Sequence, residues 1–80
     1  MISKLGVVLL LKIRDWPEHW MPVSKIPFGI QLVKWLIESR YLFCINADYD
    51  EQPAAVRITS KGANAIADNM EWLMARGYKV

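Results

Sequence analysis

The stretches LVKWLIESRYLFCIN (residues 32–46) and AAVRITSKG (residues 54–62) decide the fold of this chain. Apolar residues recur at helical spacing at the start of the first stretch and just before it, which predicts a helix from about Gly29 to Ser39. The inward face of this helix would carry Ile30, Val33, Leu36 and Ile37, and the opposite face Gln31, Lys34 and Glu38. Leu32 and Trp35 fall on the flank, so the helix is apolar around more than half of its girth.

Both stretches also contain a run of β-branched and aromatic residues. The runs Tyr41–Ile45 and Ala54–Ile58 predict two strands, and the polar segment Asn46–Pro53 between them predicts an exposed loop. Two strands joined in this way form a hairpin. Because an isolated hairpin is only marginally stable, it must pack against helices.

A last helix is predicted to begin at Thr59 or Ser60, since either hydroxyl can cap its free backbone amides. It would run to Gly77, a residue type suited to the left-handed conformation at a helix end. Its inward stripe would consist of Ala63, Ile66, Ala67, Met70, Leu73 and Met74.

Upstream, Ser3 can cap a first helix, which the Trp16-Pro17 pair ends. Its apolar run, Leu5–Leu11, is too short to span a bilayer and precedes no small-residue cleavage site, so we expect a buried helix in a cytoplasmic protein. The proline-rich connector that follows allows one helical turn, Ser24–Ile26. Its bulky residues, Trp16, Trp20 and Met21, form either a lid over the core or a contact surface.

The 80 residues suffice for one domain, residues 1–80, and 54% are hydrophobic, so a core can form without staples. The lone cysteine, Cys44, lies in an apolar run and is expected to be a small buried hydrophobe. The lone histidine, His19, has no partner at a catalytic spacing, and metal-ligand clusters and phosphate loops have no counterpart in the sequence. We therefore expect no enzyme, cofactor or small-molecule ligand.

The predicted order is helix, short turn, helix, strand, strand, helix, which is a small α+β domain. The segments Leu32–Leu42 and Val56–Gly62 resemble the winged helix-turn-helix superfamily, particularly MarR-like and related bacterial and phage regulators. The likeness covers a little over half the chain. Within it, Ile58 would end the strand inward, Thr59 would cap the final helix, and Gly62 would let that helix pass close to the sheet.

The resemblance implies a winged-helix DNA-binding regulator. We expect it to dimerise, because one module of 80 residues gives limited specificity for DNA. Gln31 and Lys34 would face the major groove, and four cations would hold phosphates: Lys25, Arg40, Arg57 and Lys61. The net charge of +2 is too small to drive such binding alone, so the arrangement of charge matters.

Two departures from the family pattern support an alternative. Only Val23–Ile26 is available for the helix that normally braces the reading helix, and the loop of the hairpin carries Asp48, Asp50 and Glu51, which would repel phosphate. The alternative is a winged-helix scaffold for protein recognition, as an adaptor, subunit or inhibitor. Because tryptophan is enriched at interface cores, the residues of this scaffold that would contact the partner are Trp20, Trp35 and Trp72.

Overall fold

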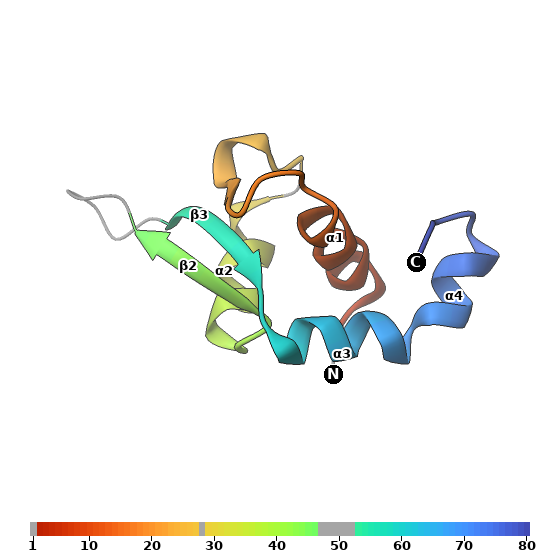
Figure 1. Ribbon diagram of the computed structural model, residues 1–80. Coiled ribbons are helices and arrows are strands. Elements are labelled where there is room, and N and C mark those ends of the chain that lie inside the picture. The colour runs from red at the N-terminus through yellow and green to blue at the C-terminus, as the bar shows by residue number, and fades with distance from the viewer. Residues whose placement is uncertain (1, 28, 47–52) are drawn as a thin grey trace.

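The computed structural model describes residues 2–27, 29–46 and 53–80 and shows a small α+β domain (Figure 1). In chain order the elements are α1 (Lys4–Arg14), β1 (Met21–Pro22), the 3-10 turn η1 (Val23–Lys25), α2 (Ile30–Glu38), β2 (Leu42–Asn46), β3 (Pro53–Ile58), α3 (Ser60–Asp68) and α4 (Met70–Ala75). This order agrees with the predicted winged-helix-like domain, with one strand added and the last helix divided. The acidic residues predicted for the loop, Asp48, Asp50 and Glu51, lie outside the described residues.

Helix α1 is the central element of the core. Ser3 caps it as predicted, because its hydroxyl accepts a hydrogen bond of 3.1 Å from the backbone N–H of Gly6. Its buried residues are Gly6, Val7, Val8, Leu9, Leu10, Leu11 and Ile13. The helix ends at Arg14 and is capped by Asp15, directly before the Trp16-Pro17 pair that predicted its end.

The sheet has three antiparallel strands in the order β1–β3–β2. The hairpin of β2 and β3 was predicted, but β1 was not, so the prediction of a two-stranded sheet was wrong. Strand β1 is two residues long and includes a proline, and it pairs with β3 through Met21 opposite Val56. On the inner face of the sheet, Met21, Leu42 and Val56 are buried in the core.

Helix α2 packs against this core through Val33 and Leu36, which are fully buried, while Ile37 is half-buried. Ile30, predicted on the same inward face, is exposed. Ile30 is the first residue of the helix, and Gly29 before it has no side chain to cap the helix. The helix therefore packs mainly through its middle and C-terminal turns.

The single long C-terminal helix predicted from the sequence is wrong, because the chain bends at Asn69 between α3 and α4 (Figure 1). The Asn69 side chain donates to the Ala65 carbonyl (2.8 Å) and accepts from Nζ of Lys4 (2.7 Å). The inward-facing stripe predicted for this segment is only partly observed. Ile66 and Leu73 are buried as predicted, but Ala63, Ala67, Met70 and Met74 are exposed, and Ala65 is buried instead.

The connector after α1 partly covers the core, as one of its two interpretations predicted. Met21 is buried and Trp16 is half-buried against the core cluster, with an indole N–H that has no hydrogen-bond partner among the described residues. The 3-10 turn Val23–Lys25 confirms the single short turn predicted for this connector, one residue earlier than Ser24–Ile26. None of the helices in residues 2–27, 29–46 and 53–80 is long and apolar enough to cross a membrane.

Candidate interaction surfaces

The solvent-facing side of α2 combines polar residues with a large aromatic one. Gln31 and Glu38 are exposed, Lys34 is half-buried, and Trp35 is 40% exposed. These four residues face away from Val33 and Leu36, which anchor the helix in the core. The outward face of this helix is therefore neither uniformly basic nor uniformly polar.

Trp35 belongs to a row of three contacting side chains. Its ring stacks on that of Tyr41, with centroids 5.9 Å apart and planes 24° from parallel. On Tyr41, in turn, lies Nζ of Lys61, 4.5 Å from the ring centroid. Lys61 also donates a hydrogen bond of 2.8 Å to the Ser39 carbonyl at the end of α2. We call these residues the Trp35 row: Trp35, Tyr41 and Lys61.

The turn that ends α2 builds this row. Arg40 has φ of 68°, a left-handed conformation that usually falls to glycine or asparagine. This turn directs the N–H of Tyr41 back to the Leu36 carbonyl (2.9 Å), which brings the Tyr41 ring next to Trp35. The Arg40 side chain is exposed, and the described residues provide it with no ion-pair partner.

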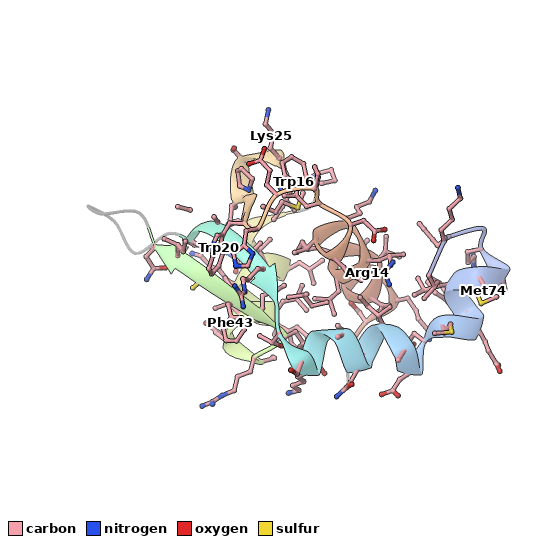
Figure 2. All side chains as sticks on the ribbon, in the orientation of Figure 1. Arg14, Trp16, Trp20, Lys25, Phe43 and Met74 are labelled. Carbon is pink, nitrogen blue, oxygen red and sulfur yellow. The ribbon has the colours of Figure 1, made fainter. Side chains whose placement is uncertain are left out.

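A second surface is the outer face of the sheet. Arg57 lies opposite Phe43 in the β2–β3 ladder, and its guanidinium is 5.4 Å from the ring centroids of both Phe43 and Trp20. The same guanidinium donates to Nε2 of His19. Figure 2 shows Trp20 and Phe43 at the sheet. Arg57 is thus held by two aromatic rings on the side of the sheet opposite to α2.

Lys25 lies on a third surface. It lines a hollow of about 450 Å³ together with Trp16, Tyr78 and Lys79. Figure 2 shows Lys25 next to Trp16. None of the residues that line this hollow belongs to α2, so the hollow is a surface distinct from the outward face of that helix.

The six residues predicted to bind DNA are divided among these surfaces. Gln31 and Lys34 lie on α2, and Arg40 and Lys61 lie at or next to its C-terminal end. Arg57 and Lys25 belong to the other two places. A continuous basic face across the helix and the hairpin is therefore not formed by these six residues.

The three predicted protein-contact tryptophans also differ. Trp35 is exposed, whereas Trp20 is half-buried beside Arg57. Trp72 is half-buried against the core and has the cations of Lys4 and Arg76 5.2 and 5.1 Å from its ring.

Neither Tyr41 nor Phe43 was predicted to be a contact residue. Phe43 is 51% exposed, and Tyr41 stacks on Trp35. Strand alternation already placed Phe43 on the face opposite to Leu42, so this signal was present in the sequence.

No protein-family model, curated protein or solved structure matches this chain.

Proposed function

We propose that this domain is a winged-helix scaffold for protein recognition, and that it binds its partner through α2 and the Trp35 row. The observation that carries the proposal is the position of Trp35. It is 40% exposed on the outward face of the helix that a DNA-binding winged helix would place in the major groove. A groove-reading helix needs polar side chains there, since base edges are recognised by hydrogen bonds.

The physical character of the row fits a protein interface. Tryptophan and tyrosine contribute large, rigid contact areas and are common among the residues that dominate binding energy. Three cations lie in or near the row, on Lys34, Arg40 and Lys61. The complementary surface is therefore an apolar recess with acidic residues at its edge. Glu38, which is exposed on the same helix, fixes the orientation by repelling acid at one point of that edge.

The test is affinity capture from host extract with matched variants, followed by binding measurements on the purified partner. Trp35→Ala should weaken binding by about 30-fold or more, since a hot-spot residue contributes roughly 2 kcal/mol or more. Met74→Ala is the control, because Met74 is 61% exposed and lies on α4 at the other end of the molecule (Figure 2). Circular dichroism must show both variants folded. Equal capture by the wild type and Trp35→Ala would rule out the proposed surface.

Binding of double-stranded DNA by a bacterial or phage transcription regulator is the second candidate. Two observations favour it: Gln31 and Lys34 lie on one exposed side of α2, and Arg40 follows at its end without an ion-pair partner among the described residues. A salt titration of duplex binding decides between the two. If the domain binds DNA, its affinity for the duplex should fall steeply with salt and should be weakened by Lys34→Ala. If the domain recognises only a protein, it should not bind the duplex even at low salt.

A cytoplasmic location accompanies both candidates. The chain has a single cysteine, Cys44, which is free, and a reducing compartment suits such a thiol.

A further inference from the structure

The two edges of the sheet differ in how they are protected against pairing with another strand. Strand β1 is only two residues long and includes Pro22, which has no N–H to donate. Strand β2 is five residues long and contains neither a proline nor a charged residue, the usual devices that block an edge. In the described parts of the chain, no strand pairs with its outer side.

The hydrogen-bonding groups directed at this open edge follow from the ladder. Next to the first pair of the ladder, Leu42 and Ile58, the N–H of Thr59 donates to the Tyr41 carbonyl (3.2 Å). Tyr41 and Thr59 therefore occupy a hydrogen-bonded position of the ladder, although the N–H of Tyr41 donates to the Leu36 carbonyl instead. Such pairs alternate along an antiparallel ladder, which assigns the N–H and C=O of Phe43 to β3. The same groups of Leu42 and Cys44 therefore point to the open edge, and those of Asn46 follow by the same alternation. The bulge lies in β3, where the ladder passes from Ala55 to Pro53, so β2 itself is uninterrupted.

The outward side chains of β2 are apolar. Phe43 is 51% exposed and Ile45 is 46% exposed, both on the outer face of the sheet. On the inner face, Leu42 and Cys44 pack with the core. An edge with free backbone groups and uncovered apolar side chains is suited to pairing with another strand.

We propose that β2 pairs antiparallel with β2 of a second copy of this chain, about a two-fold axis at Cys44. In this register Cys44 faces Cys44 of the second copy, and Leu42 faces Asn46, both as hydrogen-bonded pairs. Phe43 faces Ile45 of the second copy as a non-hydrogen-bonded pair, the arrangement in which side chains are closest. The two sheets join into one continuous sheet, and the interface does not depend on the function of the Trp35 row.

The strand is complementary to itself in this register. Three registers allow the backbone groups at the two open edges to pair with each other. In the first, Phe43 faces Phe43 of the second copy; in the central one, Phe43 faces Ile45; and in the third, Ile45 faces Ile45. Only the central register uses the N–H and C=O of all three edge-directed residues and covers both exposed side chains of each copy. Aromatic residues opposite β-branched ones are favourable cross-strand pairs. Because β2 carries no charged residue, its pairing with β2 of a second copy brings no like charges together.

The first test is sedimentation of the purified chain over a range of concentrations. Because one strand pair gives a small interface, we expect a reversible dimer with a micromolar dissociation constant. Ile45→Lys should weaken dimerisation by about tenfold or more while circular dichroism stays unchanged, because the Ile45 side chain is exposed in the monomer. Met74→Lys, which adds the same charge at an exposed apolar position remote from β2, should dimerise as the wild type does.

The second test identifies the register in chains whose Cys44 is replaced by alanine. One chain carries Phe43→Cys and another Ile45→Cys, and the two are mixed under mild oxidation. The proposed register places these cysteines with Cα atoms about 4.5 Å apart, within the range of a disulfide, so the mixed dimer should form in preference to either chain alone. A wild-type chain that stays monomeric at every concentration, an Ile45→Lys variant that dimerises like the wild type, or cross-linking without preference for the mixed pair would each overturn the proposal.

Discussion

The close contact between α3 and the sheet at Gly62 predicts a stability loss that the structure quantifies. A methyl group added at Gly62 would lie 2.5 Å from the Tyr41 carbonyl oxygen and 2.6 Å from Cγ1 of Ile58. Neither neighbour can move freely. The Tyr41 carbonyl already accepts the Thr59 N–H, and Cγ1 is close to the root of its side chain rather than at a flexible end.

The magnitude for Gly62→Ala follows from two opposing effects. Overpacking at a site that cannot relax costs about 1–3 kcal/mol, here toward the upper end because one neighbour is backbone. Replacing glycine by alanine in a helix returns up to about 1 kcal/mol. We expect a net loss of about 1–2 kcal/mol in the free energy of unfolding, or a fall of roughly 5–15 °C in Tm for a domain of this size.

Urea and thermal denaturation followed by circular dichroism measure both quantities. Gly29→Ala is the control without a steric clash, since a methyl group there meets nothing within 4 Å. Because Gly29 is the N-cap of α2, where alanine is less favourable than glycine, we expect it to cost no more than about 1 kcal/mol. If Gly62→Ala is as stable as the wild type, the close approach of α3 to the Tyr41 carbonyl is not a constraint and the reasoning fails.

Three further substitutions test the turns and the core by the same denaturation assays. Thr59→Ala removes the cap to the Gly62 N–H (3.1 Å) and the bond to the Arg40 carbonyl (2.7 Å), and should cost about 1–2 kcal/mol; Thr59→Ser should recover most of it. Arg40→Gly relieves a left-handed conformation and should stabilise the fold by about 0.5–1 kcal/mol; a loss of stability would mean that the arginine side chain itself stabilises the folded state. Leu73→Ala empties a fully buried position, so it should cost about 2–5 kcal/mol and remove hydrogen-exchange protection from α4; retained protection would show that α4 is held by other contacts.

Local chemical signals allowed much of the fold to be predicted. Ser3 and Thr59 cap the helices that they were expected to cap, and Gly77 has the positive φ of 87° expected at a helix end. Gly62 lies where the helix approaches the sheet, as predicted. Each of these signals acts within a few residues of the chain, so a single sequence contains it in full.

Features set by distant partners could not be predicted in this way. Strand β1 exists because Met21 meets Val56, and a two-residue strand with a proline carries no periodicity of its own. At the bend, Asn69 accepts a hydrogen bond from Lys4, which lies near the opposite end of the described chain, so no local pattern around Asn69 contains this contact. The predicted inward stripe assumed one straight helix, and after the bend only Leu73 of its three positions is buried. Ala63 and Ala67, which precede the bend, are exposed as well, so helical spacing alone also misplaced part of the stripe within α3.

The contact surfaces were also only partly predictable. Helical periodicity correctly placed Gln31 on the exposed side of α2. It placed Trp35 on the flank, whereas this side chain is exposed on the outward face. Arg57 was expected to hold phosphate, but the strand register surrounds it with Trp20 and Phe43. That register depends on which strands pair, and periodicity within one strand does not specify its neighbours.

The burial of α1 has a consequence for the biosynthesis of this protein. Its apolar residues, from Val7 to Ile13, are covered in the folded state by elements that are translated later, including β3 and α3, and Leu73 completes the same core. At about 5–20 residues per second, several seconds pass between translation of α1 and of Leu73. Until β3, α3 and Leu73 have left the ribosome, the apolar side of α1 has none of the partners that cover it in the folded state, so the core can close only after the C-terminal helices emerge.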